Sequence, residues 1–539
     1  MGNPPGVKLI ANLLPSLFLP PLASYGLLYI LQSYGRLMIP TWLLACCLVL
    51  SKPAHVVLTV LYRRLSNNFK ARRFGAKVVP CIKEPWPYFG GLSIARDLLN
   101  MFRDGYLGDV LEDRANEYGN TFQISPIGGN SMIWTSEPDH IKAVLAGQFD
   151  IFRKGEEFTA RNHSLLGQGI FNVDGQTWKF HRMMARPYFA RDRISDFDNF
   201  DHNLEVAIAV AQERLSEGFA INVQELMSKF ALDSFCTFLF GVNPETLSSG
   251  LSYPLVSGQY NSRSLVEHPS TSFAKAIAEG LDELLMRSLL SEWWPLREFW
   301  VDRVEAKRKA IDQYTEPILQ RVLVQGKNGV NSENAKSLLE EYISQTQGKR
   351  LPPGSFPHLL TLIADMKLLK DELLNFLVAG KDTTSNTLTF CLYKLTEHPE
   401  SVAKLRQEVL EKIGETQRPT FEGIKEMKYM RAFINEVLRL YPPVAFNERT
   451  ATRDTVLNNK DGTNPLFVPA NATVQYSVLL MHRRKDLWGP DAMLFDPDHS
   501  STNASRSTCS PTHSYSFLST RVHASVLGNS SPTTRSRSC

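Results

Sequence analysis

The stretch Ala379–Thr384, Ala-Gly-Lys-Asp-Thr-Thr, places a carboxylate beside a hydroxyl inside an apolar segment. Asp382 and Thr383 could therefore relay protons to a bound ligand. A glycine and two threonines oppose helix formation, but Gly380 would let a ligand approach the backbone, and threonine can bond to a carbonyl one turn earlier. Two helices, with Asp382 and Thr383 capping the second, are the alternative. A phosphate-binding loop is excluded because neither Ser nor Thr follows Lys381.

A second pair of residues suits an anionic ligand. Trp178 and Arg182 stand four residues apart in "TWKFHRMMARP", which places them on one face of a short helix that Pro187 ends or bends. An indole N–H beside a guanidinium can bind a carboxylate. A core tryptophan beside a solvated arginine would explain the same spacing.

A third pair has opposite charges. Glu436 and Arg439 in "INEVLRLYPP" are three residues apart, so they adjoin on one face of a helix. Phe433 and Leu440 lie within about 60° of Glu436 on the helical wheel. We therefore expect the pair to point inward, where each charge needs the other. A solvated surface pair is the alternative.

Helices must position these residues, and helical periodicity dominates the chain from about residue 96 onward. One helix is expected over residues 365–398, roughly 45 Å or more at about 1.5 Å per residue. Short strand patterns appear in "NTFQISPIG", "SMIWTS" and "ATVQYSVLL". A doubly wound nucleotide-binding sheet is unsupported because no Gly-x-Gly-x-x-Gly follows a strand. We expect a mainly α (α+β) fold with small β-sheets.

The first 62 residues predict a hydrophobic membrane anchor. Residues 9–31 carry no charge and are long enough for one span of roughly 20 residues. Residues 37–62 are also apolar but contain Pro40, Lys52 and Pro53, so a second span, a kinked span and an interfacial segment all remain open. The combined length disfavours a removable signal peptide.

A basic and Pro-rich hinge is expected over residues 63–95, between the anchor and a body over residues 96–498. The basic cluster "YRRLSNNFKARR" places the body on the cytosolic side of the membrane. The seven cysteines form no CxxC pair, which argues against a zinc site or a disulfide scaffold. The sequence has no stripe of basic residues of the kind that binds nucleic acids, so we expect no nucleic-acid partner.

Composition changes sharply after Asp498. Residues 499–539 contain no Asp, Glu or Lys and are rich in Ser and Thr, and their four arginines account for the whole formal net charge of +4. This tail has too few apolar residues to offset the entropy of ordering, so we expect it to be disordered.

The order of the motifs, Ala-Gly-x-Asp-Thr-Thr, then Glu-x-x-Arg, then a Phe-x-Pro stretch, resembles cytochrome P450, the haem-thiolate monooxygenases. The resemblance implies that Thr383, with Asp382 beside it, assists oxygen activation on a helix that crosses above a haem. It implies that Trp178 and Arg182 bind the haem propionates and that Arg449 joins them. In the family, the pair matched by Glu436 and Arg439 holds the fold.

The same resemblance implies haem as the cofactor, O2 as the oxidant and electrons from NADPH through a reductase. It also implies a helical prism on the endoplasmic reticulum membrane, with the catalytic domain facing the cytosol. The details most resemble fungal enzymes that hydroxylate alkanes, fatty acids or related lipophiles, and a xenobiotic is a further possible substrate.

The chain departs from the family pattern at its C-terminal end. The family has Phe-x-Pro-x-Arg-Phe, whereas residues 495–500 read Phe-Asp-Pro-Asp-His-Ser. The following Phe-x-x-Gly-x-Arg-x-Cys-x-Gly loop, whose thiolate is the axial iron ligand, is absent. Cys509 and Cys539 lack the flanking glycines and are not substitutes.

A shifted reading frame accounts for the missing loop. In the shifted frame, each codon joins the third base of one original codon to the first two bases of the next. The shifted codons that end in the first two bases of the codons for Ser519, Val522, Ala524, Val526 and Gly528 permit Phe, Gly, Arg, Cys and Gly, in that order. These residues have the spacing of the missing motif. We therefore expect residues 499–539 to be a frame-shifted or mis-spliced reading of the cysteine loop.

Two functions follow from these expectations. The first is a membrane-anchored haem monooxygenase that is inactive as written, because the axial cysteine is missing. The alternative is a non-catalytic, truncated membrane-associated protein.

Overall fold

The computed structural model describes most of the chain in ten segments. The described residues are 4–35, 40–83, 92–106, 108–124, 131–185, 198–254, 269–327, 337–340, 366–459 and 462–498. They fall into two compact units. The first unit comprises Met1–Glu157, Glu283–Arg303 and Asn447–Ser477, and the second comprises Phe158–Asp282, Val304–Phe446 and Val478–Cys539. The expected disordered tail lies outside the described residues.

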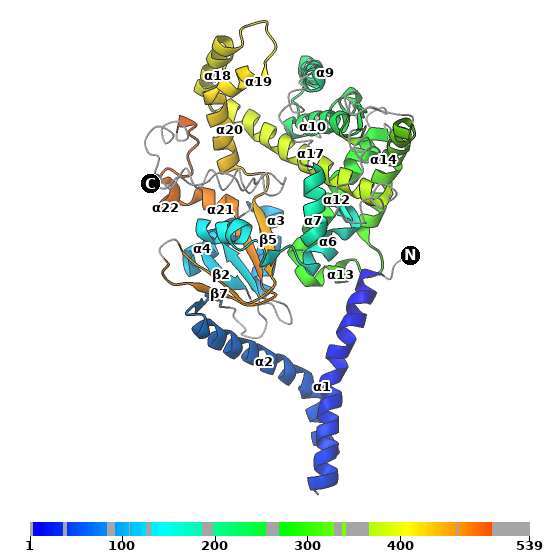
Figure 1. Ribbon diagram of the computed structural model, residues 1–539, viewed down its shortest axis with the longest axis vertical. Coiled ribbons are helices and arrows are strands. Elements are labelled where there is room, and N and C mark those ends of the chain that lie inside the picture. The colour runs from blue at the N-terminus through cyan, green and yellow to red at the C-terminus, as the bar shows by residue number, and fades with distance from the viewer. Residues whose placement is uncertain are drawn as a thin grey trace, which may run out of the picture. The chain divides into compact units, whose positions relative to one another are not determined.

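The first unit begins with two long apolar helices, α1 (Pro5–Gly35) and α2 (Thr41–Arg73) (Figure 1). Both are long and apolar enough to cross a membrane. α2 continues through the basic cluster to Arg73, so the segment expected to be a hinge begins as helix. Shorter elements follow: α3 (Leu92–Asp104), α4 (Asp109–Tyr118), α5 (Pro138–Lys142), a π-helical turn (Ala143–Gly147), a 3₁₀ turn (Ser291–Trp293) and α13 (Trp294–Arg297).

Two small sheets belong to the first unit. A three-stranded sheet has the order β1-β7-β6, and a five-stranded sheet has the order β2-β3-β8-β5-β4. Their strands are β1 (Lys77–Val78), β2 (Thr121–Ile124), β3 (Met132–Thr135), β4 (Phe152–Arg153), β5 (Phe446–Ala451), β6 (Thr455–Leu457), β7 (Leu466–Val468) and β8 (Thr473–Ser477). The parallel β3–β8 pair joins distant parts of the sequence, with Ile133 opposite Val474 in the core.

The second unit is helical. Its helices are α6 (Glu156–Leu166), α7 (Gly175–Ala185), α9 (Asp198–Ser216), α10 (Val223–Phe240), α12 (Pro269–Leu290), α14 (Arg303–Lys327), α17 (Met366–Glu397), α18 (Pro399–Lys412), α19 (Phe421–Glu426), α20 (Lys428–Leu440), α21 (Val478–Arg483) and α22 (Lys485–Trp488). The last part of α12, Glu283–Leu290, belongs to the first unit, as do the first residues of α6 and α14. Local sequence explains α10: Asn222 caps its first turn by accepting from the Glu225 N–H, and Gly241 ends it in the left-handed region.

The expected fold class is confirmed: the chain is mainly helical, with two small sheets and long apolar N-terminal helices. α17 runs unbroken through Ala379–Thr384, so the alternative of two separate helices is wrong. The strand expected in "ATVQYSVLL" ends at Ser477, and its last residues instead begin the helix α21.

Candidate functional site

The mid-helix motif on α17 has the bonding expected of threonine. Thr383 Oγ1 donates to the Ala379 carbonyl at 2.6 Å, one turn earlier, and Thr387 Oγ1 donates to the Thr383 carbonyl at 2.8 Å. These bonds satisfy the hydroxyls locally, so the threonines do not break the helix. Asp382 is half-buried, and its Oδ1 accepts from Lys381 Nζ at 2.6 Å. Asp382 and Thr383 are therefore consecutive residues of one continuous helix, with the Lys381 ammonium bound to the carboxylate.

Gly380 serves a different purpose from the one expected. A Cβ at this position would lie 2.2 Å from Cε1 of Phe235 on α10. α10 packs against α17 along this contact. The glycine is therefore needed for close packing of two helices, and the space beside it is filled by an aromatic ring rather than left for a ligand.

The expected anion-binding pair comes together on α7. The Arg182 guanidinium lies over the Trp178 ring, 5.1 Å from the ring centroid. Both side chains are half-buried. This stacking holds the planar guanidinium in one orientation, which suits it to bind a carboxylate.

α7 is joined to α17 by a buried pair that the sequence reading missed. His181, which follows Trp178 by three positions, places Nδ1 3.0 Å from Oε2 of Glu372. The two side chains are only 1% and 3% exposed. The pair fixes the helix that carries Trp178 and Arg182 against the helix that carries Thr383.

The first turns of α17 also hold the loop that leads to α7. Asp371 Oδ2 accepts from the Gln168 N–H at 2.9 Å, Glu372 Oε2 from the Ile170 N–H at 2.8 Å, and Asn375 Oδ1 from the Phe171 N–H at 3.0 Å. These three buried side chains bind consecutive parts of one loop. We call Asp371, Glu372 and Asn375 the loop-binding cluster.

The loop approaches this cluster so closely that it needs glycine. Gly167 has a φ of +55°, and a Cβ there would lie 2.0 Å from Asp371 Oδ2. A Cβ at Gly169 would lie 2.2 Å from Asn375 Nδ2. Asp371 is further paired with Arg308 at 2.6 Å. Acidic and amide side chains in the otherwise apolar run "DELLNFLV", together with "GQG" earlier in the chain, were the available sequence signal.

The third predicted pair points inward, so the surface alternative is wrong. Arg439 Nε and Nη2 donate to Glu436 Oε2 and Oε1 at 2.8 and 2.7 Å, and both side chains are buried. Arg439 also donates to the carbonyls of His482, Ala492 and Leu494 at 2.9, 2.6 and 3.1 Å. The pair therefore fixes the chain that runs from α21 toward Phe495.

Arg449 lies on β5 in the first unit. Its Nη1 donates to Asn447 Oδ1 at 2.9 Å and to the Glu448 carbonyl at 2.6 Å. Its contribution to a propionate site remains a prediction.

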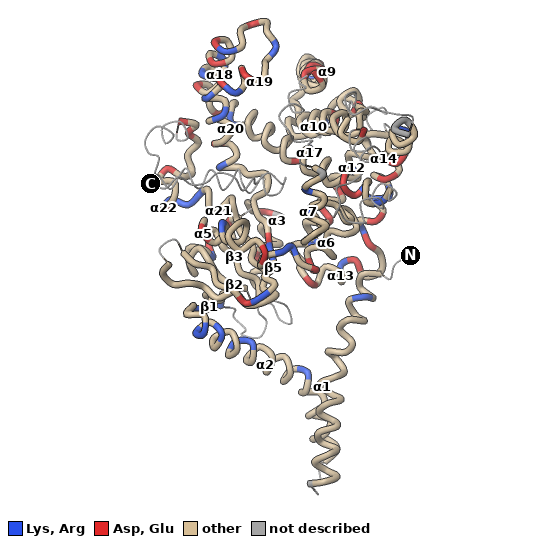
Figure 2. Tube along the Cα trace, in the orientation of Figure 1, with Lys and Arg blue, Asp and Glu red and all other residues tan. Residues whose placement is uncertain are grey.

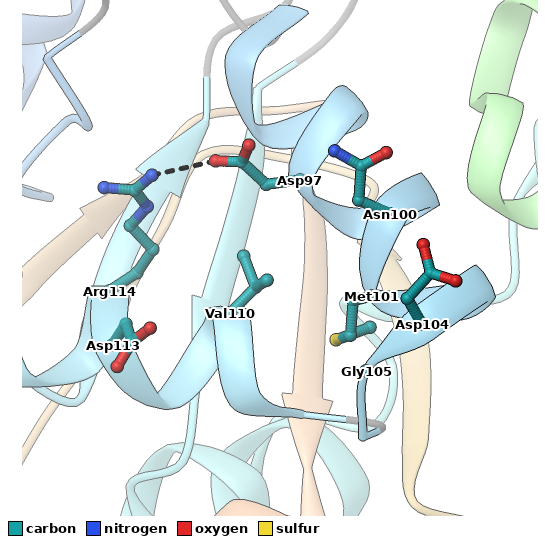
Figure 3. A pocket seen from close by; sticks show the side chains of 8 residues that line it. All are labelled: Asp97, Asn100, Met101, Asp104, Gly105, Val110, Asp113 and Arg114. Carbon is teal, nitrogen blue, oxygen red and sulfur yellow. Dashed lines mark hydrogen bonds and ion pairs between the residues drawn. The ribbon is translucent and has the colours of Figure 1, made fainter.

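A surface pocket with a volume of about 470 Å³ lies between α3 and α4 in the first unit (Figure 3). Its lining includes three aspartates and Arg114, which pairs with Asp97 at 3.1 Å. Charged side chains disfavour a lipophilic ligand here, and none of the predicted site residues lines the pocket.

The described cysteines do not fit the role of an axial thiolate, which must be anionic. Burial raises the pKa of the Cys236 thiol well above its usual value and that of Cys391 to about 11, so both stay protonated at neutral pH. The other three described cysteines lie on α2 (Cys46 and Cys47) or in the exposed stretch after β1 (Cys81). In the part of the chain that the structure describes, no group of three or more His, Cys, Asp or Glu side chains could hold a metal ion.

Comparison with known proteins agrees with this arrangement. The family described as Cytochrome P450 matches residues 80–519. Cytochrome P450 52A3-B of Candida maltosa is 33% identical over 76% of this chain and 75% of its own length. Cytochrome P450 52A6 of Candida tropicalis is 32% identical over 82% of both chains, and Cytochrome P450 monooxygenase fsdH of Fusarium heterosporum is 32% identical over 80% of this chain and 73% of its own length. The chain belongs to the cytochrome P450 family of monooxygenases.

Proposed function

We propose that the gene specifies a membrane-anchored haem monooxygenase that hydroxylates a lipophilic substrate, and that the chain as written does not turn substrate over. The substrate class is an alkane, a fatty acid or a xenobiotic, and the electrons come from NADPH through a reductase. The anchor places the enzyme on the endoplasmic reticulum membrane with its catalytic domain in the cytosol. The observation that carries the proposal is that Asp382 and Thr383 are consecutive residues on an unbroken α17.

Each residue on α7 and α17 has a defined task in this proposal. Haem, when bound, supplies the oxygen activation that defines the family. Arg182, oriented by the Trp178 ring, binds a haem carboxylate. Asp382 holds a proton beside the Thr383 hydroxyl and exchanges it with solvent, because the carboxylate is half-buried. The described residues thus supply the carboxylate clamp and the proton relay but not the sulfur ligand.

The proposed lack of turnover rests on the C-terminal sequence. In the family an arginine completes the charge cluster around the Glu436–Arg439 pair, and the cysteine loop follows it. Here the corresponding position is His499, and no such loop follows. Without a thiolate the iron lacks the electron donation that favours O–O cleavage. We therefore expect the chain as written to bind haem weakly or without a thiolate ligand.

The nucleotide sequence tests the frame-shift part of the proposal. Complementary DNA is sequenced from the codon for Phe495 to the stop codon. A transcript that restores the cysteine loop means that the organism makes an intact monooxygenase. A transcript that retains the Ser/Thr-rich tail, with no cysteine loop in the shifted frame, contradicts a frame-shift.

A non-catalytic, truncated membrane-associated protein is the second candidate, favoured by the same missing loop. Spectra of the purified chain, reconstituted with haem, reduced and exposed to carbon monoxide, test for the ligand. A thiolate-type Soret shift would overturn our proposal that the chain as written lacks a thiolate. Its absence, with a transcript that keeps the tail, supports the non-catalytic candidate.

A further inference from the structure

We infer that α1 and α2 form a helical hairpin that enters and leaves the membrane on the side of the catalytic body, so that the membrane is crossed twice and the N-terminus stays cytosolic. The inference rests on the proposed membrane anchor and extends it. A single N-terminal span would instead place the N-terminus in the lumen. The contacts that hold α1 and α2 all join residues of the first unit.

The N-terminal end of α1 is attached to the body. The Gly6 N–H donates to the Phe299 carbonyl at 3.1 Å, and Gly6 is buried. A Cβ at this position would lie only 2.3 Å from the Phe299 ring, so the approach requires glycine. α1 also packs against α13, whose label lies beside the upper end of α1 in Figure 1.

The segment that receives α1 is itself fixed. Arg287 is 1% exposed and binds Glu298 through two hydrogen bonds of 2.8 and 2.6 Å. It also binds Asp302 at 2.6 Å. A buried bidentate pair of this kind holds the segment before and after Phe299 in one conformation. Trp300 on this segment is 72% exposed, as expected of an aromatic side chain at a membrane interface.

The C-terminal end of α2 is attached to the same body. Lys70 pairs with Asp454 at 2.9 Å, and the Phe74 ring lies 5.7 Å from the Phe467 ring. β1 then pairs in parallel with β7. The chain therefore leaves the folded body of the first unit at Gly6 and returns to that body at the end of α2. A chain that starts and ends on the same side of a membrane crosses it an even number of times.

The two helices meet through an unusual hydrogen bond. Lys52 Nζ on α2 donates to the Ser16 carbonyl of α1 at 2.6 Å, and Ser16 Oγ lies 3.4 Å away. Residue 20 is proline and has no N–H, so the Ser16 carbonyl lacks the helical donor four residues on. A free carbonyl and a lysine ammonium, each costly to leave unpaired in lipid, therefore satisfy one another.

This bond removes the obstacle that left the second span undecided. A lysine interrupts the apolar part of α2, with 11 residues from Thr41 to Ser51 before it, which is too short to cross alone. With Lys52 satisfied, the stretch from Thr41 to Tyr62 reaches about 33 Å at about 1.5 Å per residue and can cross. Figure 2 shows the distribution of charge along the two helices: α1 is almost free of charge after its first turns, and basic residues gather in the C-terminal half of α2.

Glycosylation mapping of the full chain in endoplasmic reticulum microsomes tests the topology. Two variants each carry a Gly/Ser insert of about 30 residues with an Asn-Ser-Thr acceptor, one after Gly35 and the other before Met1. An insert of this length reaches about 30 Å from the chain. We expect glycan only on the insert after Gly35. Glycan on the N-terminal insert alone, or on neither insert, would overturn the hairpin. The chain without inserts is the control, since its own Asn-x-Ser/Thr acceptors at Asn162 and Asn471 report on the body and those at Asn503 and Asn529 report on the C-terminal tail.

A second comparison tests the Lys52 bond. Lys52→Arg keeps a donor, whereas Lys52→Glu offers only an acceptor to the Ser16 carbonyl, although both charges are costly to insert in lipid. We expect the glycosylated fraction of the Gly35 insert to stay within twofold for Lys52→Arg and to fall several-fold for Lys52→Glu. Equal fractions would contradict the bond. Carbonate extraction separates this failure from failure of the anchor, because only loss of the anchor releases the chain from the membrane.

Discussion

The two halves of α17 carry similar side chains with different surroundings. In the first half, Asp371, Glu372 and Asn375 are at most 3% exposed and accept from three backbone N–H groups of the loop before α7. In the second half, Asp382 is half-buried, and the hydrogen bond of its carboxylate goes to the neighbouring Lys381. Polar residues within an apolar helix thus have two uses. Those that bind the backbone of another element hold the fold, and those open to solvent can exchange protons.

The largest effect that tests this comparison is expected at the loop-binding cluster. Asp371→Ala leaves the Gln168 N–H without this acceptor and removes one of the two carboxylates, Asp371 and Asp312, that pair with Arg308, and we expect a loss of about 3 kcal/mol in the free energy of unfolding. Urea unfolding of the detergent-solubilised chain measures it. Asp382→Ala is the matched control on the same helix. Equal losses for the two variants would contradict the division of α17 into two roles.

The next effect is expected at the helix contact near the middle of α17, where Gly380 packs against α10. Gly380→Ala places a methyl group against the Phe235 ring, and we expect a loss of about 1–3 kcal/mol from overpacking. Phe235→Leu makes room, so the double variant should recover part of the loss in a double-mutant cycle. If Gly380→Ala is neutral, the glycine is not needed for packing and the ligand-approach reading returns.

A smaller effect on stability and a larger one on turnover are expected at Asp382. Asp382→Asn keeps an oxygen acceptor for Lys381, so unfolding should change by less than about 1 kcal/mol. In a chain with the cysteine loop restored, the same change should lower kcat by about 10²-fold to 10⁴-fold, because the amide cannot exchange the proton. Unchanged kcat would remove Asp382 from the relay.

The smallest effect is expected at Asp454. This carboxylate is half-buried, as Asp382 is, but it accepts from a backbone N–H, as Asp371 does. Partial burial raises the pKa of Asp454, but the Ala470 N–H and the Lys70 ammonium outweigh it, so the pKa lies below its usual value. The resulting stability is present above the unfolded pKa and is lost as the pH falls through the folded pKa. Asp454→Asn should therefore cost less than about 1 kcal/mol at neutral pH and nothing below the folded pKa. Unfolding at a series of pH values measures this, and a loss that persists in acid would exclude the ion pair as its cause.

Sequence alone could bring residues together where one helix carries the whole signal, but it left alternatives open. Spacing along a single helix predicted the Glu436–Arg439 pair and one long helix over residues 365–398, and the structure excluded the alternatives of a surface pair and of two separate helices. The Trp178–Arg182 pair follows in the same way. Each of these predictions needs only the helical period of about 3.6 residues.

Sequence was insufficient where the partner lies far along the chain. The role of Gly380 depends on its contact with Phe235 on another helix. The role of the glycines at 167 and 169 depends on Asp371 and Asn375, which lie about 200 residues later in the sequence. The Lys52–Ser16 bond likewise needs the two helices to be placed side by side. A single sequence shows the polar residue or the glycine but not the neighbour that gives it a purpose.

The central claim is that the chain has the family's framework but lacks its sulfur ligand. The direct test compares two proteins purified in parallel and reconstituted with haem: the chain as written and a chain with the shifted frame restored after Asp498. Both are reduced and exposed to carbon monoxide. We predict a thiolate-type Soret band for the restored chain only. The same band from the chain as written would contradict the claim.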